Sequence, residues 1–264
     1  MLRLNQILQQ IETHKKNLEF LRTGFNSLDE ILDGGFLRKE LIILGGSTGI
    51  GKSYMAGQIF ANMARQGFRS AYFSLEISNE MVVSRLLGAH SNIKSAKIMT
   101  SALSSEEDTL RTRAVARMSS YAQEMAFYDD TYTLEAITQE IEENKFDFVV
   151  VDFIQNVVVP GMDEYQRLSM VALEFQKLAK RANSCILVLS QLSNMVAREK
   201  GSPILEYKGS GSIATVADLG FFIQRGDIDL DPNALLLLLK KNRRGPSGIA
   251  LNYKFLPPGG LIIE

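Results

Sequence analysis

The stretch GSTGIGKS, residues Gly46–Ser53, decides the fold of this chain. It matches the phosphate-binding pattern G-x-x-x-x-G-K-[ST], and it lies between an apolar run, Leu41 to Leu44, and a helical pattern, Tyr54 to Arg65. The glycines allow several backbone N–H groups to point at one anion, and the dipole of the following helix adds positive potential. An ordinary glycine-rich turn would explain the glycines alone. The full match in this context predicts a phosphate-binding loop.

The loop predicts a Mg²⁺-bound nucleoside triphosphate as its ligand. Lys52 is expected to reach the β- and γ-phosphates, and the Ser53 hydroxyl is expected to hold Mg²⁺. The remaining contacts come from the backbone of the loop. The expected nucleotide-binding residues are Gly46, Ser47, Thr48, Gly49, Ile50, Gly51, Lys52 and Ser53.

A metal-side carboxylate is expected at the end of a neighbouring buried strand. The run Phe148 to Val151 is such a strand, and Asp152 follows it directly. We therefore predict Asp152 as the second metal-side residue. Phe153 stands where a general-base carboxylate often follows, so the base must come from another segment.

Two more strand ends supply candidates for the chemistry. Glu76 closes the run Ser70 to Leu75 and is our predicted general base, because carboxyl ends of parallel strands meet at one sheet edge. A helix-starting acid is the alternative for Glu76, and Asp129 and Asp130 are weaker competitors for the base. Gln191 closes the run Ser184 to Leu189, and its amide could sense the γ-phosphate or orient water.

Composition restricts the class of protein. The chain has 264 residues, 45% hydrophobic and 22% charged, which excludes a disordered or collagen-like chain. A net charge of −1 gives no global attraction to nucleic acid or lipid, so any such binding is local. One cysteine, Cys185, permits neither an intrachain disulfide framework nor a cysteine zinc site, and it fits a reducing cytosol. No stretch approaches the roughly 18 apolar residues of a membrane span, so we expect no membrane association.

Strand-like and helical patterns alternate from Leu41 onward, which predicts an α/β fold with a mostly parallel central sheet flanked by helices. After Asp218 the helical patterns stop, and further strands are expected as antiparallel hairpins that extend the sheet, with a turn at Arg243 to Gly248. Near the start, apolar residues at helical spacing predict a one-sided helix over Leu4 to Ile11. The expected strands are Leu41 to Leu44, Ser70 to Leu75, Met125 to Tyr128, Phe148 to Val151, Ser184 to Leu189, Phe221 to Gln224, Ala234 to Leu239 and Ile249 to Phe255.

Taken in order, six segments resemble the ATPase domain of DnaB-type replicative helicases, a branch of the RecA-like P-loop ATPases. The resemblance covers nearly the whole chain. Beside the phosphate-binding loop, it rests on Thr23 to Asp29 with Gly34-Gly35, Phe73 to Ser78 (S-L-E-M in the family), Val151 to Gln155 (Walker B with D-Y-L-Q), Leu189 to Ser193 (L-S-Q-L), Gly209 to Ile213 (S-G-S-I) and Lys241 to Gly248 (K-x-R-x-G-P-x-G).

The resemblance implies a hexameric ring that hydrolyses ATP at its subunit interfaces while translocating on single-stranded DNA and unwinding duplex. It makes Lys52, Glu76 and Gln191 catalytic in one subunit, and it makes Lys241 and Arg243 the fingers that meet a neighbour's γ-phosphate. Residues 21–264 become the RecA-like ATPase domain. Residues 1–20 become a linker helix that docks on the adjacent subunit, although periodicity alone equally fits packing on its own domain.

The resemblance also implies two DNA-binding loops, roughly Asn156 to Arg167 and Leu192 to Ser212. Cations and backbone N–H groups there would track phosphates without reading bases. A primase or a helicase loader is the further implied partner, and the implied location is the cytoplasm of a bacterium, or of the host for a phage protein. The implied DNA-binding residues are Asn194, Arg198, Lys200, Lys208, Gly209, Ser210 and Gly211.

Other interpretations stay open from the residues alone. A RadA-like or KaiC-like ATPase of recombination or protein remodelling fits the phosphate loop comparably. A nucleotide-binding assembly module that never hydrolyses ATP is the non-enzymatic alternative. The basic turn that begins at Lys240 could be a solvated hairpin turn or a patch for phosphate backbones. The Leu192 to Ser212 segment could be a disordered polar loop.

Overall fold

The fold is taken from a computed structural model, which describes residues 3–6, 8–9, 19–191, 215–227 and 229–264. Its secondary structure alternates strands and helices as far as β5, and the described residues from Leu219 onward form the strands β6 to β9. The strands are β1 (Leu41–Gly46), β2 (Ser70–Ser74), β3 (Met125–Tyr128), β4 (Phe148–Asp152), β5 (Cys185–Gln191), β6 (Leu219–Arg225), β7 (Ala234–Asn242), β8 (Ile249–Leu256) and β9 (Leu261–Ile263). The helices are α2 (Asn26–Ile31), α3 (Lys52–Arg65), α4 (Asn79–Ser91), α5 (Ser95–Met99), α6 (Ser105–Ser119), α7 (Leu134–Asn144) and α8 (Glu164–Ala182), with the 3-10 turns η1 (Ala122–Glu124) and η2 (Ile154–Asn156).

All nine described strands form one sheet, in the order β3-β2-β4-β5-β1-β6-β7-β8-β9. The strands from β3 to β6 along this order pair in parallel, and β7, β8 and β9 pair antiparallel. The predicted α/β class, with a mostly parallel sheet and antiparallel strands at its C-terminal end, is therefore confirmed. β9 was not predicted, because three residues carry too little pattern to distinguish a strand from a loop.

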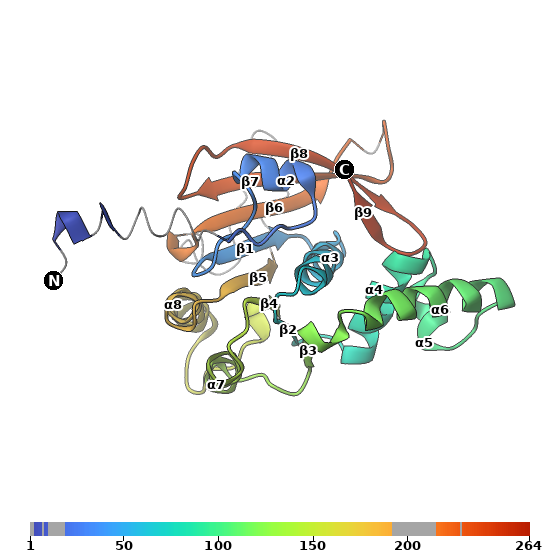
Figure 1. Cartoon of the computed structure of the whole chain (residues 1–264), viewed down its shortest axis with the longest axis horizontal. Helices are drawn as coiled ribbons and strands as arrows, with labels where there is room; N and C mark the ends of the chain where they lie inside the picture. The colour runs from blue at the N-terminus through green and yellow to red at the C-terminus, as the bar shows by residue number, and fades with distance from the viewer. Residues whose placement is uncertain (1–2, 7, 10–18, 192–214, 228) are drawn as a thin grey trace.

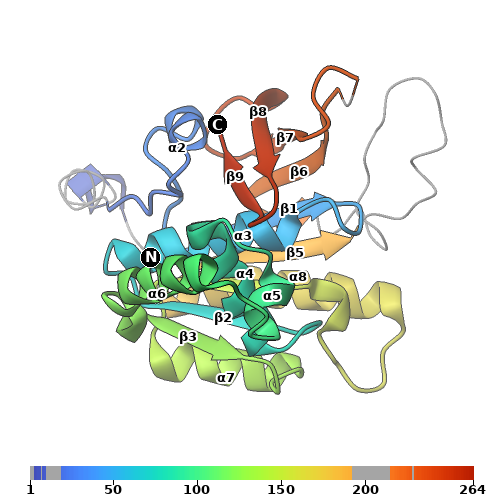
Figure 2. The same ribbon diagram turned by 90° about the vertical axis from the view of Figure 1, so that its right-hand side faces the viewer.

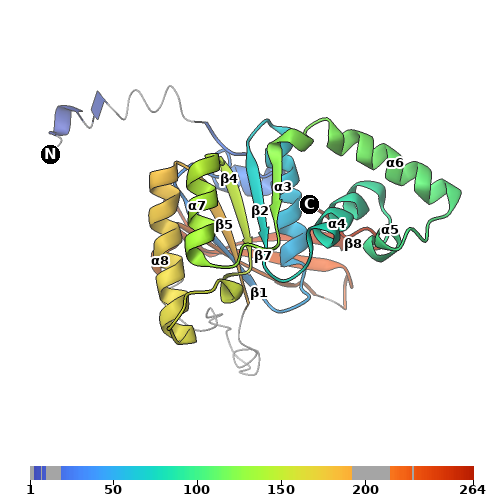
Figure 3. The same ribbon diagram turned by 90° about the horizontal axis from the view of Figure 1, so that it is seen from below.

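Helices cover both faces of the sheet, as Figures 1 and 3 show. Side chains of β1 alternate between two apolar cores: Ile42 and Leu44 face the core under α2, α3 and α4, whereas Leu41 and Ile43 face the core under α7 and α8. This double burial explains why the central strands are continuous apolar runs. Figure 2 shows α4, α5 and α6 gathered in front of α3.

Residues 4–6 and 8–9 are helical, as the periodicity predicted. Leu4 is 69% exposed and Leu8 is 49% exposed, so their apolar side is not buried against the chain's own domain. Figure 1 shows this segment far from the sheet. None of the described helices has both the length and the apolar composition needed to cross a bilayer.

Candidate phosphate-binding and catalytic site

The phosphate-binding motif forms a loop between β1 and α3, as predicted from the sequence. β1 ends at Gly46, and α3 begins at Lys52. Gly51 precedes the helix with φ 114°, a left-handed conformation that favours glycine. At Gly46 the reason for glycine is space, because a Cβ atom would lie 2.7 Å from the carbonyl oxygen of Ile223 on β6. The backbone is thereby held close against the neighbouring strand.

Lys52 folds back over this loop. Its Nζ donates to the carbonyl oxygens of Gly46 and Ser47, at 2.8 and 2.9 Å. Burial lowers the pKa of Lys52, whereas the nearby carboxylates of Asp152 and Glu76 oppose that shift. The ammonium is therefore held within the loop, where it is suited to meet a phosphate.

Asp152 ends β4 and is only 4% exposed. The hydroxyl of Tyr72 donates to its Oδ2 at 2.7 Å, and the Ser53 side chain also hydrogen-bonds to it. Burial raises the pKa of Asp152, and these hydrogen bonds together with Arg85 and Lys52 act in the opposite direction. Tyr72 was not anticipated, because it is one aromatic residue in an apolar run and nothing in the sequence shows which carboxylate it meets.

The oxygens of Ser53 and Asp152 fit Mg²⁺, which prefers hard oxygen ligands. Mg²⁺ usually takes one or two protein ligands and completes its shell with water and substrate phosphates. The pair thus suits a metal that arrives with a phosphate ligand.

A hollow of about 240 Å³ lies beside the loop. The sequence-predicted residues Glu76 and Gln191 both line it. They reach it from either side of Asp152, because β4 lies between β2 and β5 in the sheet. The lining residues are Thr48, Gly49, Gly51, Lys52, Ser53, Tyr54, Glu76, Ile77, Arg85, Asp152, Phe153 and Gln191.

The competing carboxylates lie elsewhere. Asp129 accepts a hydrogen bond from the N–H of Asn79 at 2.8 Å, so it caps the start of α4. Asp130 accepts from the hydroxyl of Thr131. Neither lines the hollow. Of these three candidates for the base, Glu76 is therefore the one that lines the hollow.

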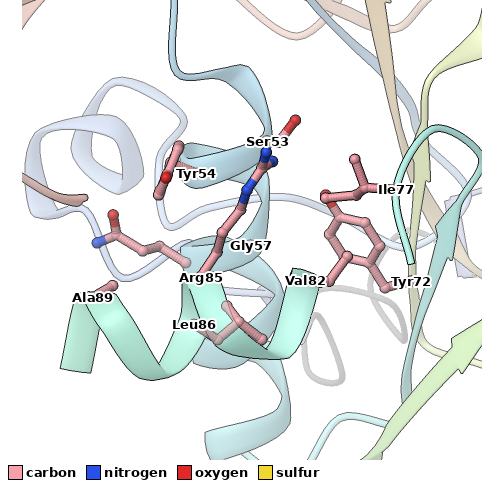
Figure 4. Close-up of a pocket in the computed structure, with 10 residues that line it drawn as sticks. Ser53, Tyr54, Gly57, Tyr72, Ile77, Val82, Arg85, Leu86 and Ala89 are labelled. Carbon is pink, nitrogen blue, oxygen red and sulfur yellow. The ribbon is translucent and has the colours of Figure 1, made fainter. Parts of the chain in front are cut away.

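Arg85 also lines the hollow, and sequence reasoning missed it. Figure 4 shows its side chain extending from α4 toward Ser53 and Tyr54, and its Cζ lies 5.3 Å from the centre of the Tyr54 ring. One signal was available in the sequence. Val82, Leu86 and Ala89 are buried apolar residues of α4, and Arg85 lies among them at helical spacing.

Lys241 and Arg243 lie far from this hollow. β7 runs antiparallel to β6, and its last residue, Asn242, pairs with Leu219 at the beginning of β6. Arg243 forms an ion pair with Asp218, and the Nζ of Lys241 donates to the Thr215 carbonyl at 2.6 Å. The basic turn is thus anchored rather than simply solvated.

The predicted DNA-binding residues follow β5 in the sequence. Asn194, Arg198, Lys200, Lys208, Gly209, Ser210 and Gly211 all lie outside the described residues.

A match to a protein-family model identifies the family of the chain. The model for the DnaB-like helicase C terminal domain matches residues 21–256. The chain belongs to this family. The resemblance on which the sequence analysis relied is therefore confirmed.

Relatives within the DnaB-like family are longer than this chain. The replicative DNA helicase DnaC of Bacillus subtilis (strain 168) is 29% identical over 257 residues, a match that covers 91% of this chain and 56% of that protein. The chain therefore spans little more than half the length of that relative.

Two solved structures share the RecA-like fold. One is an isolated ATPase domain, with a TM-score of 0.84 at 21% identity, over 98% of this chain and 96% of that one. The other is a DnaB-like replicative helicase, described together with its interactions with primase, with a TM-score of 0.85 at 20% identity, over 100% of this chain and 67% of that one.

Proposed function

We propose that this chain is the motor of a replicative-type DNA helicase, a Mg²⁺-dependent ATPase that translocates on single-stranded DNA and unwinds duplex. The observation that carries the proposal is the convergence of Lys52, Asp152, Glu76 and Gln191 on one hollow, in a chain of the DnaB-like family. The family membership favours this function over a RadA-like or KaiC-like role in recombination or remodelling.

The nucleotide phosphates would bind at the amino end of α3. There the loop N–H groups, the helix dipole and the Lys52 ammonium all present positive charge. Ser53 and Asp152 would hold Mg²⁺, which when bound neutralises charge on the phosphates. Arg85 enters the same hollow from α4 and adds a second cation that comes from this subunit.

Glu76 would take a proton from the attacking water onto its carboxylate. Gln191 lies across Asp152 from Glu76, and its neutral amide would orient that water or sense the γ-phosphate. The protein's contribution is mainly to position these groups and to present a preorganised electrostatic field.

Arg243 and Lys241 would act on the nucleotide of a neighbouring subunit. The six residues of β1 separate its two ends by roughly 17 Å, with the phosphate loop at one end and Asp218, the partner of Arg243, at the other. Arg243 is therefore too far away to reach the hollow of its own subunit. A closed ring in which each subunit completes its neighbour's site satisfies this geometry, and we propose a hexamer.

The remaining partners follow from the same proposal. Single-stranded DNA would run through the ring and contact Arg198, Lys200 and Lys208 by their charge, with Asn194 and Gly209 to Gly211 supplying polar and backbone contacts. The helix in residues 1–20 would dock its exposed Leu4 and Leu8 on the adjacent subunit. Primase or a loader would be a partner in the cytoplasm of a bacterium or of a phage host.

Steady-state ATP hydrolysis, with and without single-stranded DNA, tests this function when the oligomer mass is measured at the same protein concentration. Hydrolysis stimulated by DNA, together with a ring-sized mass, is the expected result. Glu76→Gln should bind nucleotide without turnover and serves as the control for contaminating ATPases. A fully assembled ring whose hydrolysis ignores DNA would contradict the helicase function.

A further inference from the structure

The turn η2, directly after β4, joins the two sides of the hollow. Because β4 lies between β2 and β5, residues that follow it stand between the ends of both neighbours. Two consecutive amide side chains occupy this place, Gln155 and Asn156. Gln155 bonds toward β5, and Asn156 bonds toward β2.

The side chain of Gln155 continues the hydrogen bonding to β5 beyond the end of the β4–β5 pairing. The pairing of β4 with β5 ends at Val151 and Val188, but β5 continues to Gln191. Beyond that point the amide of Gln155 acts as a peptide group would. Its Oε1 accepts from the N–H of Gln191 at 3.3 Å, and its Nε2 donates to the Gln191 carbonyl at 3.3 Å and to the Ser190 hydroxyl at 3.2 Å.

Asn156 bonds to the segment that follows β2, on the other side of β4. Its Nδ2 donates to the carbonyl of Leu75 at 2.8 Å. The N–H of Leu75 donates to the Asp152 carbonyl, also at 2.8 Å. Both backbone polar groups of Leu75 are therefore held from the β4 segment, and Glu76 is the next residue.

The turn itself is fixed by the core. Ile154 and Val157 flank the two amides, and both are fully buried in the apolar core shared with α7 and α8. With those side chains anchored, the half-buried Gln155 and Asn156 remain at the edge of the sheet. Neither lines the hollow, so neither is expected to touch the nucleotide.

We infer that Gln155 and Asn156 are a pair of positioning residues that set the separation between Gln191 and Glu76 across the phosphate site. The inference rests on the proposed ATPase function. It predicts an effect on turnover rather than on nucleotide binding, because Gln191 and Glu76 would act on the attacking water whereas the loop and Lys52 hold the phosphates.

The test measures kcat, KM and the affinity for a fluorescent ATP analogue in Gln155→Ala and Asn156→Ala. Each change is expected to lower kcat by about 10- to 100-fold, because small displacements of catalytic groups are costly. KM and analogue affinity should stay within about threefold of the wild type.

Two matched controls remove equivalent amides elsewhere. Gln58 makes the same two-way contact with a strand backbone, accepting from the Ile262 N–H at 2.7 Å and donating to its carbonyl at 3.0 Å. Asn62 donates to the Thr23 carbonyl at 2.9 Å. Gln58→Ala and Asn62→Ala should leave kcat within about twofold of the wild type.

Double variants separate positioning from general destabilisation. In a Gln191→Ala background, Gln155→Ala should lower kcat by less than about a further twofold, because the side chain that Gln155 positions has been removed. Asn156→Ala should still lower kcat by its full factor in that background. If either alanine variant unfolds, Gln155→Glu and Asn156→Asp keep the side-chain size and remove the amide donor, and they should show the same loss of kcat.

The outcomes are distinguishable. Loss of kcat with unchanged affinity and the expected non-additivity supports the inference. Folded variants that keep full kcat, or that lose only affinity, overturn the inference alone. A wild-type chain that shows no turnover under any condition overturns the proposed function, and the inference with it.

Discussion

Arg243 is ion-paired with Asp218, with 3.0 Å between Nη1 and Oδ1. The other carboxylate oxygen of Asp218 accepts from the N–H of Leu41 at 2.9 Å. Arg243 is thereby tied to the first residue of β1, whereas the phosphate loop begins at the last residue of β1. The buried strand β1 therefore links the candidate phosphate site of a subunit to Arg243, the cation that this subunit would present to a neighbour.

This arrangement predicts complementation between two inactive variants. Arg243→Ala subunits would retain Glu76, and Glu76→Gln subunits would retain Arg243. Mixed rings should therefore recover part of the ATPase activity, because some interfaces contain both groups. Turnover is measured over a range of mixing ratios, with mixing verified by native mass spectrometry. No recovery in verified mixed rings would contradict action in trans.

Lys52→Ala should lower ATP turnover by at least about 100-fold, because it removes the buried ammonium that would stabilise charge on the phosphates. Steady-state phosphate release measures the effect. Lys180→Ala removes an exposed lysine from α8 and should leave turnover unchanged. Retained activity in Lys52→Ala would refute the assignment of the phosphate loop.

A stability prediction concerns Glu40, which is 7% exposed and paired with Arg244 at 2.8 Å. Arg244→Ala should destabilise the fold by about 3 kcal/mol near neutral pH, because it leaves a buried carboxylate without its cation. Urea unfolding measures the change. Arg111→Ala, which breaks the exposed pair with Asp108, should cost less than about 1 kcal/mol.

The Arg244→Ala effect should depend on pH in a defined direction. Burial raises the pKa of Glu40, and Arg244 opposes that shift. With a raised folded-state pKa, stability is present at low pH and is lost as pH rises through the folded-state value. Removing Arg244 raises that value further, so the variant should lose more stability at about pH 8 than at about pH 5. An equal loss at both values would contradict this assignment.

DNA affinity should fall steeply with salt if Arg198, Lys200 and Lys208 neutralise phosphates. Replacing all three with alanine should make the slope of log K against log salt shallower by about 2, from roughly 0.7 for each phosphate contact on a single strand. Fluorescence anisotropy with a labelled oligonucleotide measures the slope. The control removes three exposed cations from α6 and α8, Arg113, Lys177 and Lys180, and should not change it.

Much of the fold and of the candidate site follows from local patterns that can be recognised in the sequence. A phosphate loop needs glycines, a lysine and a following helix in consecutive positions, so Gly46–Ser53 could be recognised without coordinates. The shared place of Asp152, Glu76 and Gln191 could be predicted because each follows an apolar strand, and parallel strands bring their carboxyl ends to one edge. Alternating strand and helix patterns likewise predicted the parallel sheet.

Tertiary structure decided the contacts between segments that are distant in sequence. Tyr72 meets Asp152, and Arg85 enters the hollow from α4, because strand order and helix packing bring them there. Gln155 and Asn156 bond to opposite neighbours only because β4 lies between β2 and β5. A sequence pattern records which residues turn inward, but strand order determines which partner each one meets, and this order depends on the packing of the whole sheet.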